Sequence, residues 1–183
     1  LMLIDESKLL CFLIDIQEKL FPKIFDNQSI FHKVKTYLQI INNMNLPLIL
    51  TEQYPRGLGK TIDMIESDIK TKNFFKFQKT SFSCVGSDDV KDQLSNLGKK
   101  QVLLCGIETH ICVLQTAFDL KEMDYDVFIL DECVGSRNKL DKEIGLSRLR
   151  KFGCTILTLE MLAFELVRGS VHPNFKSISD LIK

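Results

Sequence analysis

Short, almost continuously apolar runs alternate along this chain with longer segments of helical periodicity, and this alternation limits the folds that it can adopt. The apolar runs lack the polar residue at every second position that marks a half-exposed strand. Strands that are apolar on both faces belong to parallel sheets with helices packed on each side. The pattern therefore predicts an α/β protein, a three-layer α/β/α sandwich with a mostly parallel central sheet of about six strands.

The alternation extends over the whole chain of 183 residues. The expected strands are residues 9–15, 46–51, 74–78, 101–106, 126–131 and 154–158. The expected helices are residues 29–44, 88–97, 111–123, 141–152, 160–167 and 177–182. Because no linker, internal repeat or low-complexity segment interrupts the pattern, residues 1–183 are expected to form a single domain.

The balance of charge argues against nucleic acid as the main partner. Lys and Arg together number 24, as do Asp and Glu, so the chain lacks the basic field of a dedicated nucleic-acid binder. The basic and aromatic segment 70–80 keeps an RNA-associated alternative open. A strand with Phe inward and Lys outward explains that segment more simply. No apolar run reaches the roughly 18 to 20 residues that span a bilayer, so no membrane partner is expected.

The six cysteines show neither CxxC pairing nor metal-ligand spacing, and several lie inside expected strands. This usage is typical of structural thiols in a reducing compartment, so a cytoplasmic protein is expected. The chain begins with Leu, which leaves open a trimmed targeting segment for mitochondria or another organelle.

Three chemically capable side chains follow different expected strands. Asp15 ends the first strand, Lys79 follows the third, and Cys112 follows the fourth at the start of a helix. Ligands of parallel α/β sheets collect beyond the carboxyl ends of the strands. We therefore expect these three groups to converge within about 3 to 5 Å of one another.

Each of the three residues also has a simpler explanation. A thiol in the first turn of a helix gains a lowered pKa and is a candidate nucleophile, but Cys112 also suits a small core position. Asp15 is a candidate general base, a candidate helix N-cap or a member of a structural ion pair. Lys79 is either a cation that stabilises both ionised groups or an ordinary solvated lysine.

The spaced motifs resemble those of the isochorismatase-like cysteine hydrolase superfamily, which includes nicotinamidases, N-carbamoylsarcosine amidases and isochorismatases. The resemblance covers almost the whole chain and is nearest to the eukaryotic isochorismatase-domain-containing subgroup. The motif residues are Asp15 and Gln17 in LIDIQ, Lys79 in FQKTSFS, and Gly106, Thr109, Cys112 and Val113 in GIETHICV.

The resemblance implies a metal-independent cysteine hydrolase that acts on a small amide- or acyl-type substrate. Asp15 would take the proton of Cys112, the thiolate would form a thioester, and Lys79 would stabilise the charges. The backbone N–H groups of Glu108 and Cys112 would form the oxyanion hole, with a cis Ile107–Glu108 peptide bond. We expect the Glu108 carboxylate to turn away and pair with a cation or a backbone donor, because it would oppose the oxyanion. The family is commonly dimeric to octameric, which implies a homo-oligomer without a cofactor.

Further residues are candidates for the walls of the substrate pocket: Gln17, Phe21, Gln53, Tyr54, Thr80 and Thr109. Nicotinamidases hold a metal with histidines after the second strand, whereas residues 51–64 here contain none, so no metal site is expected. A Cys–His dyad with His110 is not expected, because residues two apart on a helix do not face each other. Two rival functions stay open: a catalytically weak binding or scaffold protein with this fold, and an RNA-associated nuclease.

Overall fold

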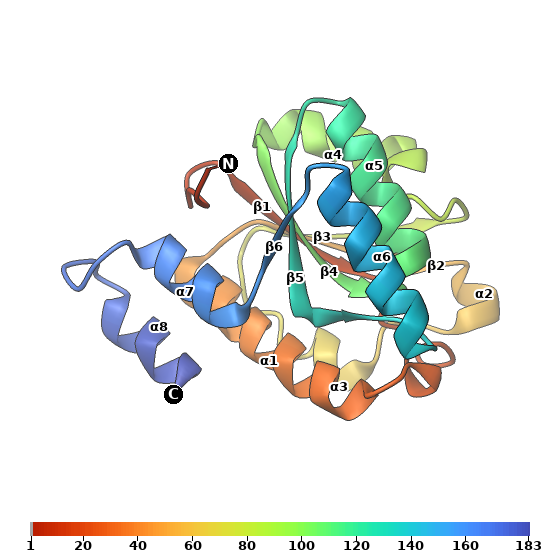
Figure 1. Cartoon of the computed structure of the whole chain (residues 1–183), viewed down its shortest axis with the longest axis horizontal. Coiled ribbons are helices and arrows are strands. Elements are labelled where there is room, and N and C mark those ends of the chain that lie inside the picture. The colour runs from red at the N-terminus through yellow and green to blue at the C-terminus, as the bar shows by residue number, and fades with distance from the viewer. Residues whose placement is uncertain (1) are drawn as a thin grey trace.

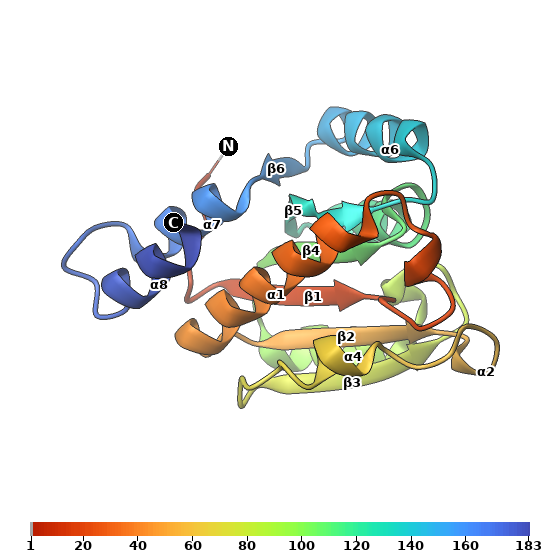
Figure 2. The same cartoon turned by 90° about the horizontal axis from the view of Figure 1, so that it is seen from below.

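The computed structural model describes residues 2–183 and has one six-stranded sheet at its centre. The strands run in the order β3-β2-β1-β4-β5-β6, and every neighbouring pair is parallel. Their bounds are β1 Leu9–Ile14, β2 Leu48–Gln53, β3 Phe74–Lys79, β4 Gln101–Ile107, β5 Asp126–Gly135 and β6 Thr155–Leu157. Figure 2 shows the strands stacked in this order. The predicted parallel α/β fold is confirmed.

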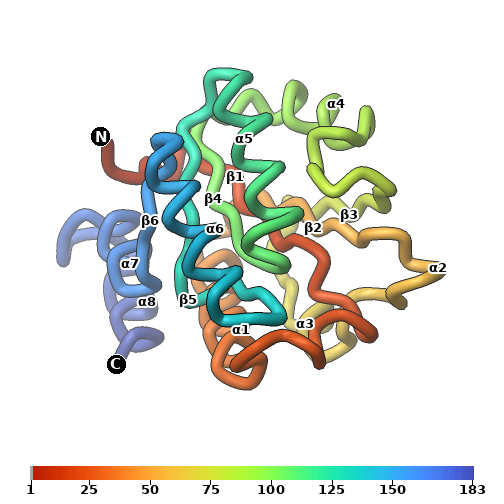
Figure 3. The backbone as a smooth tube through the Cα atoms, turned by 45° about the vertical axis from the view of Figure 1, so that its right-hand side comes forward, coloured from red at the N-terminus to blue at the C-terminus, as the bar shows by residue number. Residues whose placement is uncertain are grey.

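Helices cover both faces of the sheet (Figure 1). One layer consists of α1 (Asn27–Met44), α3 (Asp63–Glu66), α7 (Leu159–Val167) and α8 (Phe175–Ile182). The other layer consists of α4 (Asp88–Leu97), α5 (Leu114–Glu122) and α6 (Lys139–Lys151). Helices α7 and α8 pack side by side next to β6 (Figure 3), while the short α2 (Pro55–Leu58) lies beyond the carboxyl ends of the strands (Figure 2).

Strand β1 explains why the apolar runs are continuous. Leu9, Cys11 and Leu13 face the core beneath α1. The alternate residues Leu10, Phe12 and Ile14 face the core beneath α4 and α5. All six are at most 1% exposed, so a polar side chain on either face would lose its contact with water.

The largest differences from the sequence expectation lie at two element boundaries. Strand β5 continues to Gly135 instead of ending at residue 131, because its pairing with β4 resumes after an irregularity between Leu104 and Gly106. The helix expected from residue 111 begins instead with a π-helical turn, Thr109–Val113, before α5 starts at Leu114. Both differences arise at the edge where β4 ends, and they set the position of Cys112.

Strand β3 forms one edge of the sheet and contains the basic and aromatic segment. Lys76 points outward and lies 3.0 Å from Glu52 and 2.9 Å from Glu66. Lys79 points to the opposite side of β3 from Lys76, and its side chain is fully buried against Asp15. Within residues 2–183, no helix is long and apolar enough to cross a membrane.

Candidate active site

Asp15 lies just beyond β1 in a left-handed backbone conformation, with φ of 53°. This conformation is uncommon for residues other than glycine, and aspartate and asparagine tolerate it better than most. The Asp15 N–H donates to the Thr51 carbonyl at 3.1 Å, and its carbonyl accepts from the Gln17 N–H at 2.9 Å. The tight turn leaves the carboxyl group at the carboxyl edge of the sheet, with no exposure to solvent.

The Asp15 carboxylate forms a buried ion pair with Lys79. Its Oδ2 lies 2.7 Å from the Lys79 Nζ, and both side chains are 0% exposed. The other oxygen, Oδ1, accepts a hydrogen bond from the Thr51 hydroxyl at 2.8 Å. A buried carboxylate needs such partners, and here a cation and a hydroxyl supply them. Asp15 is therefore a member of a structural ion pair, and this is compatible with a role as general base.

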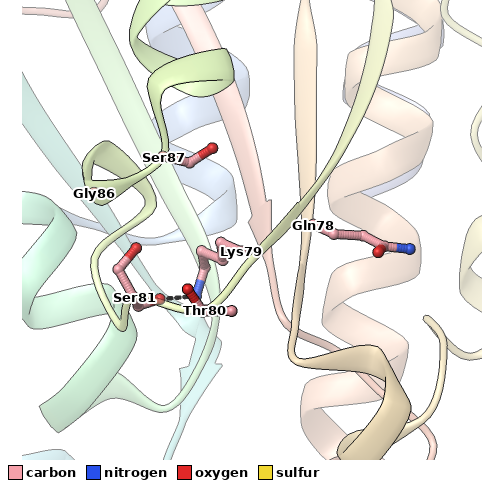
Figure 4. A pocket seen from close by; sticks show the side chains of 6 residues that line it. All are labelled: Gln78, Lys79, Thr80, Ser81, Gly86 and Ser87. Carbon is pink, nitrogen blue, oxygen red and sulfur yellow. Dashed lines mark hydrogen bonds between the residues drawn. The ribbon is translucent and has the colours of Figure 1, made fainter.

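Lys79 is held by oxygen atoms from several directions. Its ammonium donates to the Gln53 Oε1 at 2.7 Å, to the Phe82 carbonyl at 3.0 Å and to the Ser81 carbonyl at 3.2 Å. Figure 4 shows the bond to Ser81 beside a small cavity that Thr80, Gly86 and Ser87 also line. This set of acceptors fixes the ammonium against Asp15, and the solvated-lysine alternative is wrong.

Cys112 lies in the π-helical turn between β4 and α5, close enough to Asp15 and Lys79 for their charges to act on its thiol. Gly106 lets β4 approach β1 closely, because glycine readily adopts a φ of 123°. A Cβ at this position would lie 2.1 Å from the Ile14 carbonyl oxygen, so only glycine fits. The structure thus brings Asp15, Lys79 and Cys112 together at one edge of the sheet.

The three groups alter one another's proton affinity. Burial raises the pKa of Asp15, although Lys79 and the hydrogen bonds from Thr51 and Cys112 oppose the shift. Burial alone would lower the pKa of Lys79, but the attraction of Asp15 leaves that pKa raised. Lys79 thus favours the charged form of Asp15, and Asp15 favours the protonated form of Lys79.

The pKa of the Cys112 thiol is raised, first by burial and then by the Asp15 charge, while Lys79 opposes the shift. The position of Cys112 at a helix start predicts a lowered pKa. That expectation is wrong for the resting site, because the thiol is only 5% exposed and a carboxylate lies against it. The raised pKa keeps Cys112 as a protonated thiol beside Asp15.

The residues around the expected oxyanion hole agree with the resemblance in two respects. The Ile107–Glu108 peptide bond is cis. The Glu108 Oε1 accepts hydrogen bonds from the Arg137 backbone N–H at 2.9 Å and from its Nε at 3.1 Å. The predicted pairing of Glu108 with a cation and a backbone donor is confirmed.

Two of the expected pocket residues brace the site instead of facing a ligand. The Gln53 side chain binds Lys79 and donates to the Thr80 carbonyl at 2.7 Å. The Gln17 side chain accepts from the Gln53 N–H at 2.8 Å and donates to the carbonyls of Gln53 and Gly59 at 3.0 and 2.7 Å. Both amide groups are thus occupied by protein partners, which favours positioning roles over substrate binding.

The remaining expected pocket residues differ in exposure. Phe21 is 5% exposed and packs in the core beneath α1, which favours a packing role. Tyr54 is 54% exposed at the start of α2, and Thr80 is exposed after β3. The Thr109 hydroxyl is buried, and it has no hydrogen-bond partner among the described residues. A buried hydroxyl without a partner is uncommon and suggests that a ligand or water completes it.

Sequence reasoning missed Thr51 and Cys84. The Thr51 hydroxyl bonds to Asp15 and lies 3.6 Å from the Cys84 Sγ. The available signal was a hydroxyl residue inside an apolar strand, next to a strand that ends in Asp. Across the described part of the chain, no cluster of three or more His, Cys, Asp or Glu side chains could hold a metal ion.

Comparisons with known proteins show the family of this chain. The family model of the isochorismatase domain matches residues 9–161. Isochorismatase family protein 1B of Dictyostelium discoideum is 39% identical over 175 residues, which cover 94% of this chain and 84% of that protein. Isochorismatase domain-containing protein 2 of Danio rerio is also 39% identical, over 95% of this chain and 85% of that protein.

Among solved structures, the MAR1 ribonuclease from Caenorhabditis elegans superposes with a TM-score of 0.92 at 32% identity, covering 99% of this chain and 92% of that one. A parallel α/β/α sheet with a carboxylate, an ammonium and a thiol at its carboxyl edge defines the class of isochorismatase-like hydrolases. The chain belongs to the isochorismatase family.

Proposed function

We propose that the protein is a metal-independent cysteine hydrolase that acts on a small amide- or acyl-type substrate through a thioester on Cys112. One observation carries this proposal: the Cys112 thiol lies beside a buried carboxylate, Asp15, which is itself held by Lys79 and Thr51. A thiol beside a base that is itself oriented by further groups is the arrangement of an activated nucleophile. A purely structural cysteine has no need of it.

The reaction begins when the Asp15 carboxylate accepts the Cys112 proton as the sulfur attacks the acyl carbon. The C–S bond forms while the carbonyl π electrons move to oxygen, where the N–H groups of Glu108 and Cys112 donate to the oxyanion. Collapse of this intermediate expels the amine or alcohol, which takes the proton from Asp15. Water, deprotonated by Asp15, then cleaves the thioester and restores the thiol.

Lys79 keeps the carboxylate ionised until substrate arrives, because its ammonium favours the charged form of Asp15. A raised thiol pKa suits this scheme, since deprotonation is coupled to attack rather than completed beforehand. The unpaired Thr109 hydroxyl supports a substrate contact beside the nucleophile. Exposed Tyr54 and Thr80 remain candidates for the pocket wall.

The direct test is to incubate the protein with a panel of small amides and activated esters and to map any added mass by peptide mass spectrometry. We expect an acyl group on Cys112 in the wild type and none in Cys112→Ala. Cys154→Ala is the matched control, since Cys154 is also 5% exposed and its pKa is raised to about 11 by burial. Acylation that survives in Cys112→Ala would contradict the proposal. A folded protein with no adduct or turnover would favour the binding-protein rival.

The proposal includes a cytoplasmic homo-oligomer. All six cysteines are free and buried, which supports a reducing compartment. Leu140 and Ile144 are 64% and 51% exposed one turn apart on α6, which supports a surface that a second copy covers. Light scattering after size-exclusion chromatography gives the assembly size, and a monomer at micromolar concentration would contradict the oligomer.

A second candidate, cleavage of RNA, is favoured by one finding, the similarity to a structure described as a MAR1 ribonuclease. The surface gives it little support, because Lys76 in the basic segment is neutralised by Glu52 and Glu66. We expect no degradation of single-stranded RNA by nuclease-free preparations. Degradation that is lost in both Cys112→Ala and Asp15→Asn would establish this activity instead.

A further inference from the structure

The turn that carries the nucleophile, residues 108–112, is fastened to a neighbouring segment that the reaction scheme does not use. That segment, residues 136–141, consists of the connection from β5 to α6 and the first residues of α6. Its Arg137 donates twice to the Glu108 Oε1, from the backbone N–H at 2.9 Å and from Nε at 3.1 Å. Glu108 is 4% exposed, so this one contact satisfies a buried charge.

The second attachment runs through His110. Its Nδ1 lies 2.8 Å from the Ser136 Oγ, and its Nε2 lies 3.9 Å from the Asp141 Oδ2. Asn138 donates to the same Asp141 oxygen at 2.9 Å. Ser136 is 1% exposed and the His110 side chain is 24% exposed, so the contact between them is partly buried.

Helix α6 also packs against the turn. A Cβ added at Gly145 would lie 3.2 Å from the His110 Cα, closer than ordinary van der Waals contact. The helix backbone therefore rests almost directly on the backbone of the turn. Glu108 and His110, both in the turn, are hydrogen-bonded to two consecutive residues, Arg137 and Ser136 respectively.

We propose that Arg137, together with Ser136, is a positioning residue for acyl transfer. Acting through Glu108 and His110, the two residues hold the N–H groups of Glu108 and Cys112 where the oxyanion develops. This inference rests on the proposed function, because it assigns a role in the same reaction. Arg137 also neutralises the Glu108 carboxylate, which would otherwise repel the negative charge of the intermediate.

Two reagents that attack the same sulfur separate this role from a general effect on the thiol. Acylation of Cys112 by p-nitrophenyl acetate passes through a tetrahedral oxyanion, whereas alkylation by iodoacetamide does not. In Arg137→Met we expect acylation to slow roughly 10- to 100-fold, the scale of a misplaced catalytic group. Alkylation of Cys112 should change less than about threefold, because it depends on thiolate and access alone.

Three further variants complete the design. Arg137→Lys keeps a cation beside Glu108 and should recover part of the acylation rate. Ser136→Ala leaves the Arg137–Glu108 pair intact and should slow acylation by a smaller factor. Arg150→Met, the same change at an exposed arginine of α6, should leave both rates unchanged. Circular dichroism confirms that each variant is folded.

Equal slowing of acylation and alkylation in folded Arg137→Met would overturn the inference, because the residue would then act on the thiol itself. Unchanged acylation in both Arg137→Met and Ser136→Ala would overturn it as well. If wild-type protein gains no acetyl group on Cys112, the proposed function fails first, and that outcome is distinct from either of the other two.

Discussion

The Nζ of Lys79 lies 2.7 Å from the Oδ2 of Asp15, and neither side chain exposes any surface to solvent. A buried ion pair is costly to break from one side, because the remaining charge stays in a site without water. The pair is therefore both a catalytic feature of the proposal and a constraint on stability.

Lys79→Met is expected to lower the free energy of unfolding by about 3 to 5 kcal/mol, since it leaves Asp15 buried without its cation. The double variant Asp15→Asn with Lys79→Met should recover part of that loss, because no unpaired charge remains. Urea denaturation measures both. As a control, Lys91→Met removes the exposed pair with Asp88 and should cost less than about 1 kcal/mol. A double variant no more stable than Lys79→Met would show that the charge is not the cause.

The acidic limb of the profile of activity against pH should follow the ionisation of Asp15. A general base works only when ionised, so activity is present above the pKa of Asp15 and falls as the pH drops through it. Burial raises that pKa, so the limb should lie above the ordinary carboxyl value of about 3.9. The Thr51 hydroxyl stabilises the ionised carboxylate, so Thr51→Val should move the limb to still higher pH with the alkaline plateau retained. A limb that stays in place in Thr51→Val would exclude Asp15 as the titrating group.

Asp15→Asn should affect the thiol and the reaction in opposite directions. The Asp15 charge raises the pKa of Cys112, so its removal should lower that pKa, as followed by ultraviolet absorbance of the thiolate. Turnover of an amide should nevertheless fall roughly 10²- to 10⁴-fold, because the general base is gone. Cys112→Ala identifies the absorbance that belongs to this thiol. A faster reaction in Asp15→Asn would show that thiolate population, and not base catalysis, limits the rate.

Chelation should leave the hydrolase activity unchanged. No His follows the second strand within residues 51–64, and the described residues contain no cluster of donors suited to a metal ion. The measurement compares activity and bound metal before and after dialysis against EDTA. Loss of stoichiometric zinc or iron together with activity, and its return on adding the metal back, would contradict the metal-independent mechanism.

The layers of the fold and the three central residues could be predicted from sequence, because both depend on local signals. Continuous apolar runs indicate strands buried on both faces, and the polar residue after each run marks the carboxyl edge. The pairing of Lys79 with Asp15 was predictable to the same extent, since both follow strands of one parallel sheet. Strand alternation places Lys79 on the same face of β3 as Phe75 and Phe77, so its burial against Asp15 agrees with that pattern.

The features of the site that could not be predicted from the sequence depend on contacts between segments that are distant in the chain. The Thr51 hydroxyl reaches Asp15 because β2 pairs directly with β1, and this strand order is not encoded in either segment alone. The pKa of Cys112 was misjudged because a helix start is a local feature, whereas burial and the Asp15 charge come from elsewhere. Gln17 and Gln53 were assigned to substrate because an amide binds a ligand and a backbone group equally well.

Gly106 offers the sharpest test of how β4 delivers the nucleophile to its base. A Cβ there would lie 2.1 Å from the Ile14 carbonyl oxygen, and φ is 123°. Gly106→Ala must therefore push β4 away from β1, and we expect a loss of at least about 3 kcal/mol in the free energy of unfolding. Gly98→Ala is the matched control, since Gly98 also has positive φ, at 60°, but nothing lies within 4 Å of its added Cβ; it should cost about 1 kcal/mol. Equal losses in the two variants would show that backbone conformation alone, and not the close approach of Ile14, requires glycine at position 106.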